Sequence, residues 1–597
     1  MWVVMKGHNR WYDIQQEAAS GDITLLPQKT NLIYQTSLIY CFNDEQSLYY
    51  IDKEFNFYAF HIPTQKNEFI ANLGKEIQER GKISSIVHYH NSYFVGFLMD
   101  GILLLEKQKE TDHYQIQSLP INGGVFCLKK DRFQDVVWIG TDGQGVYLYS
   151  NPLYSIKSMV LSNYTEKIER PVRAIYLDDE RTFWVGTKGN GILKIYDYEF
   201  DKNISDCRAE VLTTSNSALS SNAVYCFAKS HRNLLWIGDE EGLTYYSYRE
   251  KRIKSIPIRI GNEDFKYIHG IYETADSELW LASVGMGVVK ARIAGTPDNP
   301  VIVDAQRYII NDGELGSNYF FTIYAENEAN LLFGNKGYGV FRYNETTNGL
   351  EPVSTHKYEN MTLNNILAIS KDSSNNYLFG TSYGLIKYTS ETSYQLFNAK
   401  NGFLNNTIHA ILRNSSDDFW LSTNLGLINF DTKRNVFRSY GFGDGLKVVE
   451  FSDGAAFRDS QTGTLFFGGI NGVVAIRADG RPEQLYMPPV YFDKLSIFGE
   501  QYNLGEFLTR KKETEVLNLQ YDQNFFSVSF ASVDYLNGNN CTYFYKLKGL
   551  SDQWVNNGSE SGVSFTNMAP GACTLLVKYN NSVFDKESDV YSLVIRI

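Results

Sequence analysis

Hydrogen-bonding side chains recur in this sequence fourteen residues before a bulky aromatic residue or leucine. The residues at this place are Arg170, Asn222, Lys266, Asn318, Asn364 and Asn406, and Arg173, His269 and His409 lie near them. Asparagine and arginine offer planar, paired hydrogen bonds that suit sugar hydroxyls and carboxylates. We therefore expect these nine residues to be candidates for a ligand-binding site.

The asparagines also have a simpler interpretation. Asparagine is favoured in turns, where its side chain binds the backbone of a loop. The sequence leaves both interpretations open for each asparagine, and it does not identify the ligand.

The bulky residues mark a repeat that must position these side chains. They are Trp2, Tyr49, Phe94, Trp138, Trp184, Trp236, Trp280, Leu332, Leu378, Trp420 and Phe466, and they recur every 42 to 52 residues. Apolar and polar residues alternate around them, as in Gly145–Tyr149, which is typical of strands. A repeat of this length with several strands is the signature of a β-propeller blade, in which a bulky residue fills the wedge between neighbouring sheets.

Eleven markers exceed the blades of one propeller, which has roughly four to eight. We predict an all-β fold with a partial first propeller of about three and a half blades at residues 1–158 and a seven-bladed propeller at 159–481. The blades of the second propeller run from about Arg170 to Ile476. We expect the N-terminal part of the first propeller to be missing from this chain.

The repeat stops near Asp479, and Met487-Pro488-Pro489 marks a boundary. Beyond it, short alternating strands are predicted at 490–492, 525–530, 542–547 and 575–579. This pattern favours an immunoglobulin-like β-sandwich at residues 482–597.

Composition and motifs argue against several other functions. The net charge of −12 is unsuited to nucleic-acid binding, which needs a basic face. No phosphate-binding loop, His-Glu-x-x-His or Cys-x-x-Cys motif occurs. The acidic stretch Asp178–Glu180 falls in a predicted turn, where charged residues are normal. We expect no catalytic residues, no metal site and no cofactor.

Several stretches resemble a known family. Leu219–Tyr225 followed by Leu235–Gly238 looks like the two-component-regulator propeller repeat, and Glu450–Phe457 looks like that family's final blade. The segment Asn524–Trp554, with Tyr543-Phe544-Tyr545, is similar to its triple-tyrosine module. Together these resemblances cover nearly the whole chain.

The resemblance implies the periplasmic sensor region of a hybrid two-component system. It implies an oligosaccharide ligand, and a C-terminal sandwich that leads to a membrane helix and a histidine kinase outside this chain. It also suggests a homodimer through the sandwich. The chain itself is expected not to be an enzyme.

Two other functions remain open. A protein-interaction scaffold would share the fold and expose a large apolar patch on a propeller face. A propeller glycosidase or lyase would need two converging carboxylates about 5–10 Å apart.

Overall fold

The structure is a computed structural model that describes residues 2–5, 8–16, 23–28 and 38–597, except 45, 109–112, 151–153, 164–167, 203, 311–317, 354–363, 391, 404, 479–485, 512–513, 537 and 582–585. The chain divides into two compact units, Met1–Pro152 and Leu153–Ile597. Each unit is described by itself.

The first unit contains four antiparallel sheets among its described residues. They are β1 (Trp2–Met5), β2 (His8–Gln16) and β3 (Ile23–Gln28); β4 (Leu38–Asn43), β5 (Ser47–Asp52), β6 (Asn56–His61) and β7 (Lys66–Asn72); β8 (Ile83–Tyr89), β9 (Ser92–Phe97), β10 (Ile102–Lys107) and β11 (Tyr114–Ser118); and β12 (Val125–Lys130), β13 (Val136–Thr141) and β14 (Val146–Ser150). A short helix, α1 (Gly74–Arg80), joins β7 to β8.

The second unit begins with seven four-stranded antiparallel sheets in its described residues, here numbered sheets 1 to 7. Sheets 1 to 3 are β16 (Val172–Leu177), β17 (Phe183–Thr187), β18 (Ile192–Ile195) and β19 (Ala209–Leu212); β20 (Val224–Lys229), β21 (Leu234–Asp239), β22 (Leu243–Ser247) and β23 (Arg252–Ser255); and β26 (Ile268–Glu273), β27 (Glu278–Ser283), β28 (Gly287–Thr296) and β29 (Asn299–Tyr308). A ribbon of β24 (Arg259–Ile260) and β25 (Glu263–Asp264) precedes sheet 3.

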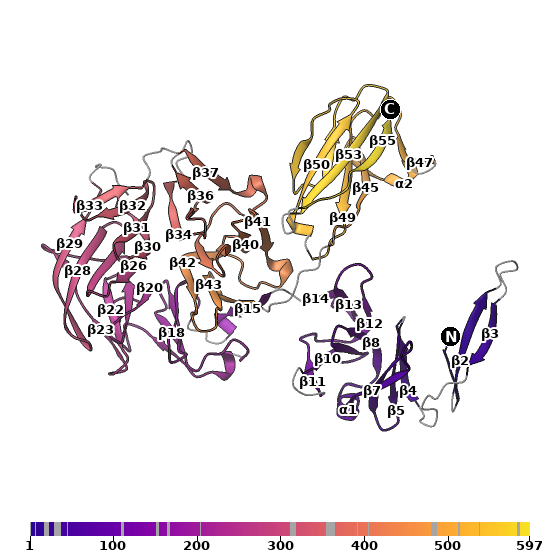
Figure 1. The fold of residues 1–597 in the computed structure, drawn as a ribbon, viewed down its shortest axis with the longest axis horizontal. Coiled ribbons are helices and arrows are strands. Elements are labelled where there is room, and N and C mark those ends of the chain that lie inside the picture. Colours follow the sequence, from indigo (N-terminus) through magenta and orange to yellow (C-terminus); the bar gives the residue numbers. More distant parts are fainter. Residues whose placement is uncertain are drawn as a thin grey trace. The chain divides into compact units, whose positions relative to one another are not determined.

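Sheets 4 to 7 continue the same order. They are β30 (Phe320–Asn327), β31 (Asn330–Asn335), β32 (Gly339–Asn344) and β33 (Gly349–Pro352); β34 (Ile366–Lys371), β35 (Tyr377–Thr381), β36 (Gly384–Ser390) and β37 (Ser393–Phe397); β38 (Ala410–Arg413), β39 (Asp418–Ser422), β40 (Leu427–Asp431) and β41 (Val436–Tyr440); and β42 (Phe451–Arg458), β43 (Leu465–Gly469) and β44 (Gly472–Ala478) with β15 (Tyr154–Val160). Figure 1 shows them following one another from magenta to orange.

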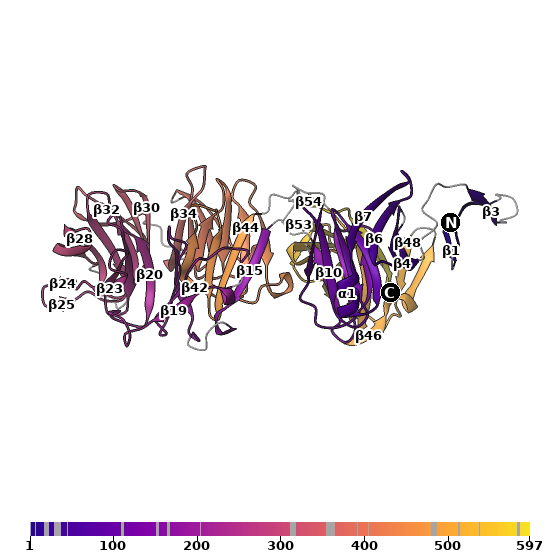
Figure 2. The same cartoon turned by 90° about the horizontal axis from the view of Figure 1, so that it is seen from below.

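The seven sheets form a closed ring. The first strands touch in sequence, from β16 through β20, β26, β30, β34 and β38 to β42, and β42 touches β16 again. The last sheet takes its outer strand from the start of the unit, because β15 pairs with β44 (Figure 2). β15 lies on both sides of the predicted boundary between residues 158 and 159.

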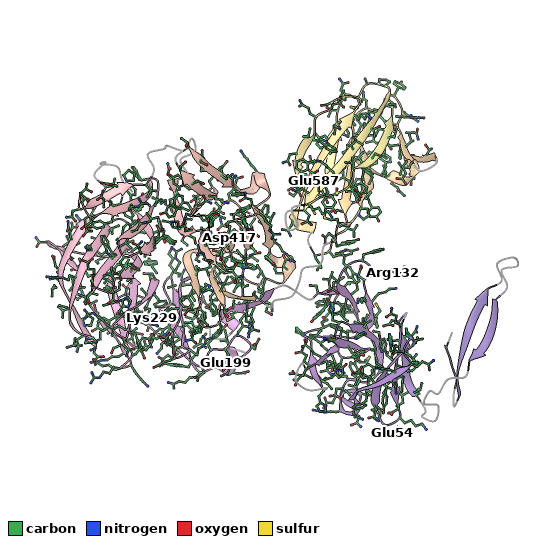
Figure 3. The ribbon with its side chains drawn as sticks, in the orientation of Figure 1. Glu54, Arg132, Glu199, Lys229, Asp417 and Glu587 are labelled. Atoms are coloured by element: carbon green, nitrogen blue, oxygen red, sulfur yellow. The ribbon has the colours of Figure 1, made fainter. Side chains whose placement is uncertain are left out.

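The bulky markers of sheets 1 to 7 occupy equivalent places, as the repeat predicts. Each lies on the second strand of its sheet and belongs to the apolar cluster that joins this sheet to the next. Trp184, Trp236, Trp280 and Trp420 are fully buried there. Trp138, in the first unit, is half-buried. Side chains fill the wedges between the sheets (Figure 3).

The glycine two residues after most markers is required by close packing between sheets. A Cβ atom on Gly186 would lie 2.8 Å from Val224 of sheet 2, and one on Gly380 would lie 2.9 Å from Ile408. Real Cβ atoms do not approach other atoms so closely, so a larger residue at Gly186 or Gly380 would displace its neighbours.

The C-terminal part of the second unit consists of two sheets around one core. One sheet contains β45 (Val490–Ile497), β46 (Glu500–Asn503), β49 (Phe526–Ser532) and β52 (Gly562–Phe565). The other contains β47 (Leu508–Lys511), β48 (Thr514–Asn518), β50 (Cys541–Lys548), β51 (Val555–Gly558), β53 (Ala572–Asn581), β54 (Lys586–Glu587) and β55 (Tyr591–Arg596). Residues of both sheets, among them Phe526 and Leu575, form the buried cluster between them.

The remaining elements are short. They are the helix α2 (Leu504–Phe507) and the 3-10 turns η1 (Leu161–Asn163), η2 (Ile204–Asp206), η4 (Ala399–Asn401), η5 (Phe442–Asp444) and η6 (Gly538–Asn540). In the described part of the chain, no helix has the length and apolar character to cross a bilayer.

Candidate functional site

The asparagines predicted as ligand contacts lie just before the first strands of their sheets, and the backbone uses them. The carbonyl oxygen of Asn222 accepts hydrogen bonds from the Gly189 and Gly191 amides of the preceding sheet, at 3.0 and 2.8 Å. The carbonyls of Asn318 and Asn364 bind the corresponding glycine turns of sheets 3 and 4. These asparagines therefore join neighbouring sheets.

The side chains of three of these asparagines hold the preceding loop. In each case the Oδ1 atom accepts a backbone N–H group. The pairs are Asn222 with Thr214 at 2.9 Å, Asn318 with Ile310 at 2.7 Å and Asn406 with Ala399 at 2.9 Å. This geometry agrees with the turn interpretation of the asparagines.

Arg170 and Lys266 lie at the surface of the ring. Arg170 is exposed, and its backbone N–H donates to Asn190 at 2.8 Å. The Lys266 ammonium is 2.5 Å from a carboxylate oxygen of Glu241. The hydrogen bond and the charge of Glu241 raise the pKa of Lys266. Both residues remain accessible to a ligand, but Lys266 already has an ionic partner.

The other three predicted residues share a different position, eleven residues before the marker, which is a β-bulge of the first strand in the sheets of Arg173 and His269. In sheets 1 to 5 the register between the first and second strands skips one residue. The skipped residues are Arg173, Tyr225, His269, Phe321 and Leu367. His409 stands at the same place before β38, eleven residues ahead of its marker. A bulge turns its extra side chain out of the regular alternation, and the first strands surround the centre of the ring.

Sheet 7 carries a longer bulge that reaches the centre of the ring. Its register skips from Phe451 to Ala456, which leaves residues 452–455 unpaired. β42 contacts β20, β30 and β34 as well as its two neighbours. Asp453 lies in this segment and comes together with the bulge residues of other sheets.

The charged side of the centre is built around Asp453. The Nδ1 atom of His409 is 2.5 Å from Asp453 Oδ1, and its Nε2 atom is 2.6 Å from Asn424 Oδ1. Arg173 Nη1 is 3.6 Å from Asp453 Oδ2. Burial acts to raise the pKa of Asp453, but the hydrogen bond and charge of His409 and the charge of Arg173 outweigh it and lower the pKa. The carboxylate is therefore ionised near neutral pH.

The opposite side is aromatic. The rings of Tyr225 and His269 stack with centroids 4.2 Å apart, and Phe321 meets His269 edge-on at 5.5 Å. Burial, and then the charge of Arg173, lower the pKa of His269 to about 3. The imidazole is therefore neutral near pH 7 and keeps one donor and one acceptor nitrogen.

One buried donor at this centre has no hydrogen-bond partner within the described residues. The Nε atom of Arg173 is buried and has no hydrogen-bond partner in the described residues. The Nη1 atom of the same guanidinium makes the ionic contact with Asp453 at 3.6 Å. Buried donors of this kind are costly unless a ligand or water binds them.

Acidic residues in the turns of sheets 1 and 6 have structural roles. Asp178 Oδ2 accepts from the Trp184 indole at 2.9 Å, and Asp178 Oδ1 accepts from the Thr182 amide at 2.8 Å. Asp417, labelled in Figure 3, accepts from the Ser373 hydroxyl at 2.6 Å. Within the described ranges no group of three or more His, Cys, Asp or Glu residues could hold a metal ion.

The sequence reasoning missed Tyr225, Phe321, Asn424 and Asp453. Tyr225 and Phe321 were detectable, because they precede their markers by the same eleven residues as Arg173 and His269. Asp453 breaks this spacing because sheet 7 has a longer bulge. Asn424 joins the site only through its contact with His409.

The chain is similar to known proteins in sequence and in fold. Residues 534–597 match the Y_Y_Y domain. Over 446 residues, 71% of this chain, the sequence is 23% identical to histidine kinase P4 of Formosa agariphila, and the match covers 31% of that protein. The chain therefore spans about a third of the length of this curated relative.

The fold is similar to a solved extracellular domain. The crystal structure of the extracellular domain of the putative hybrid two-component system BT3049 from B. thetaiotaomicron aligns over 100% of this chain and 82% of that domain, with a TM-score of 0.63 and 23% identity. These matches confirm the resemblance: the chain matches the Y_Y_Y domain, and it is similar in sequence to a histidine kinase and in fold to the extracellular domain of a putative hybrid two-component system.

Proposed function

We propose that this chain is the periplasmic, ligand-sensing part of a hybrid two-component receptor and that it binds an oligosaccharide at the centre of the ring. In this proposal the ring is a seven-bladed β-propeller, residues 1–158 form part of another propeller, and the C-terminal two-sheet module is an immunoglobulin-like sandwich. The similarity to a histidine kinase and to an extracellular domain supports this assignment.

The observation that carries the ligand site is the guanidinium of Arg173, whose buried Nε donor lacks a hydrogen bond within the described residues. Its side chain is 15% exposed, it faces an ionised carboxylate without a hydrogen bond, and its Nε has no partner in the described structure. Arginine offers five donors in a fixed planar arrangement. A ligand with adjacent hydroxyl or carboxylate oxygens would satisfy them.

The aromatic side of the centre suits the same ligand. A sugar ring has an apolar face that packs on aromatic side chains and hydroxyl groups at its edge that form hydrogen bonds. Tyr225, His269 and Phe321 supply aromatic faces or edges within one stacked group. We therefore propose Arg173, His269, His409, Tyr225 and Asp453 as the principal ligand contacts, with Arg170 and Lys266 at the rim.

Binding is favoured over hydrolysis at this site. Glycoside hydrolysis normally uses two carboxyl groups that flank the bond to be cleaved. The skipped residues at the start of the first strands of sheets 1 to 5 and residues 452–455 of sheet 7 include a single carboxylate, Asp453, which His409 and Arg173 engage. We propose no catalytic role for the chain and no cofactor.

Isothermal titration calorimetry tests this function. The chain is titrated with defined neutral and acidic oligosaccharides of four to ten sugars, and the sugars are analysed afterwards by chromatography. We expect saturable binding of one oligosaccharide without cleavage. Arg173→Ala should weaken it by about tenfold or more, because a charge-assisted hydrogen bond contributes roughly 1.5–3 kcal/mol.

Arg434→Ala is the matched control, since this exposed arginine lies in the turn between β40 and β41, outside the bulge segments. Accumulation of shorter sugars would refute the proposal in favour of an enzyme. Equal losses in the Arg434 and Arg173 variants would refute the assigned site.

A protein-interaction role has one observation in its favour. Phe442 and Leu425, in loops of sheet 6, are 80% and 53% exposed, and Leu425 follows the site residue Asn424 directly. Exposed apolar groups of this size often mark contact surfaces. A protein partner that is lost in Phe442→Ser, in a chain that binds no oligosaccharide, would support this second function.

We further propose that the sandwich relays the signal to a membrane helix and kinase and that two copies pair through it. The sandwich sheet of β45 and β49 exposes Tyr491, which is 55% accessible. Analytical ultracentrifugation should show a dimer that Tyr491→Glu weakens. An entirely monomeric chain at high micromolar concentration would refute the pairing.

A further inference from the structure

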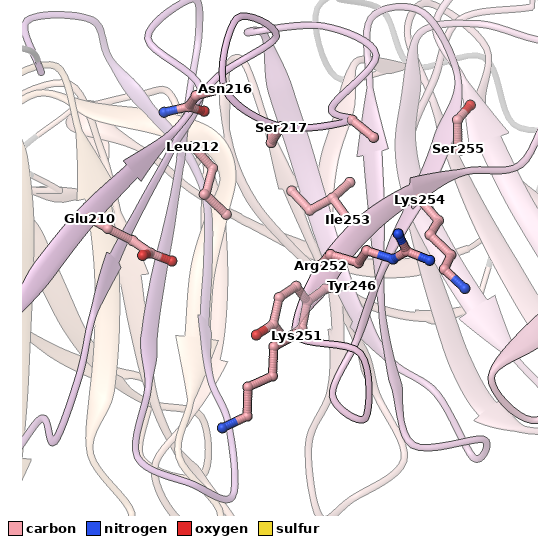
Figure 4. A pocket seen from close by; sticks show the side chains of 11 residues that line it. Glu210, Leu212, Asn216, Ser217, Tyr246, Lys251, Arg252, Ile253, Lys254 and Ser255 are labelled. Atoms are coloured by element: carbon pink, nitrogen blue, oxygen red, sulfur yellow. The ribbon is translucent and has the colours of Figure 1, made fainter.

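A groove lies between sheets 1 and 2, away from the bulge residues. Glu210 and Leu212 of β19 line one side, and Tyr246 of β22 and Ile253 of β23 line the other (Figure 4). The cavity has a volume of about 550 Å³. A second cavity of about 270 Å³ shares Glu210, Tyr246 and Lys251 with it. The two form one groove along the junction, with room for a short chain of sugars.

The floor of the groove is a buried lysine whose contacts are satisfied. The Lys194 ammonium lies 4.5 Å from the Trp184 ring centroid and 4.6 Å from that of Tyr246. It is 3.1 Å from a carboxylate oxygen of Glu210 and donates to the Tyr196 hydroxyl at 2.9 Å. Lys194 thereby offsets the charge of Glu210, while Asp178 and Glu180 also line the smaller cavity.

The basic residues above this floor differ in their partners. Arg252 and Lys254 both contact the carboxylate of Glu250. Lys251 has no acidic partner within 4 Å in the described residues, although it lines both cavities. Arg208 is exposed and likewise lacks an acidic partner in the part of the chain that the structure describes, and its guanidinium lies 4.7 Å from the Tyr196 ring centroid.

We infer that this groove is a second binding site, for a sugar chain that carries carboxylate or sulfate groups. Two cations without acidic partners stand at its rim in a chain whose net charge is −12. An anionic group that contacts both would form charge-assisted hydrogen bonds without displacing an existing ion pair. The inference rests on the proposed function only in taking the ligand class to be carbohydrate.

A sugar fits the groove better than an added peptide strand. A peptide would pair with the free edge of β19 through backbone hydrogen bonds. The Asn216 amide already donates to the Val211 carbonyl of this strand at 2.8 Å, and Asn216 Oδ1 accepts from the Thr213 amide at 2.7 Å. The loop thus occupies part of the backbone that a peptide would need.

The test compares binding of four probes to the whole chain. They are an oligogalacturonate, a sulfated oligosaccharide, a neutral oligosaccharide of equal length and a short polyglutamate, each titrated by calorimetry at 20 and 200 mM NaCl. We expect at least one of the two anionic sugars to bind, more weakly at the higher salt. The anionic sugar that binds identifies the charged group.

The variants separate the groove from the centre of the ring. Lys251→Asn with Arg208→Gln removes both cations. Asparagine suits the positive φ of 52° at Lys251, since Asn435 and Asn348 have the same conformation in the corresponding turns of sheets 6 and 4. Lys433→Gln is the matched control, because Lys433 is an exposed cation in the equivalent turn of sheet 6.

The double variant should bind the anionic sugar about tenfold or more weakly, whereas Lys433→Gln should bind it unchanged. The groove assignment fails if neither anionic sugar binds or if the double variant binds normally. It also fails if Arg173→Ala alone abolishes binding, or if polyglutamate binds and both anionic sugars do not. A neutral sugar whose binding depends on Arg173 would leave the proposed function intact in each of these cases.

Discussion

Gly186→Ala tests the close contact between neighbouring sheets. A Cβ atom at this position would lie 2.8 Å from Val224 Cγ1, 3.0 Å from Ala174 Cβ and 3.1 Å from Val224 Cβ. Val224 is fully buried, so it has little room to move. Such overpacking costs about 1–3 kcal/mol, whereas replacing a strand glycine by alanine otherwise gains about 0.5–1 kcal/mol. The steric term is larger, and we expect a net loss of about 1–2 kcal/mol.

The double variant Gly186→Ala/Val224→Ala isolates this contact. Val224→Ala alone should cost about 2 kcal/mol through the cavity it leaves. It also removes the Cγ1 atom that the new methyl group meets. The double variant should therefore be more stable than the sum of the single changes predicts, by about 1 kcal/mol or more.

Equilibrium urea unfolding, followed by the fluorescence of the buried tryptophans, measures these differences. Gly349→Ala is the matched control, because this strand glycine has ordinary contacts of 3.8 Å. It should be neutral or slightly stabilising. If Gly186→Ala is as stable as Gly349→Ala, or if the double variant equals the sum of its parts, the packing argument is wrong.

Two further predictions concern titration. Burial raises the pKa of Asp239 to about 6, although Ser220 and two backbone amides donate hydrogen bonds to it. The raised pKa increases the free energy of unfolding below pH 4 by about 3 kcal/mol, and this contribution is lost as the pH rises to 6. Asp239→Thr copies Thr381 of sheet 5 and should remove this loss. The free energy of unfolding of both proteins is measured from pH 4 to 7. Equal slopes of this free energy against pH in the two proteins would contradict the account. Arg173→Ala should raise the pKa of His269 from about 3 towards 6.5, because it removes a nearby positive charge. NMR titration of the ring protons measures this pKa. An unchanged pKa would show that Arg173 does not act on this histidine.

The repeat was predictable from sequence because its physical cause is local. Every junction between sheets needs a bulky residue, so Trp184, Trp236, Trp280 and Trp420 recur at nearly constant spacing and occupy equivalent buried positions. The close approach of the next sheet explains the glycine that follows most of them.

Closure of the ring depends on contacts that no local pattern records. Tyr154–Val160 pairs with Gly472–Ala478, more than 300 residues later in the chain. The sequence shows an apolar strand at each place, but it does not show that the two are neighbours. The boundary predicted inside β15 reflects this limit.

The site was predictable only in part for a related reason. Counting back to the start of each first strand selected the asparagines, which hold loops and neighbouring sheets. The side chains that gather at the centre lie three residues later, at bulges. A bulge changes the direction of a side chain without changing the apolar pattern, so residue types alone do not reveal it.

A crystal structure of the chain with the oligosaccharide selected by calorimetry tests the central claim most directly. The account predicts sugar oxygens within about 3.2 Å of the Arg173 guanidinium and a sugar ring against Tyr225 or His269. A sugar bound elsewhere, with Arg173 facing only Asp453, would contradict it.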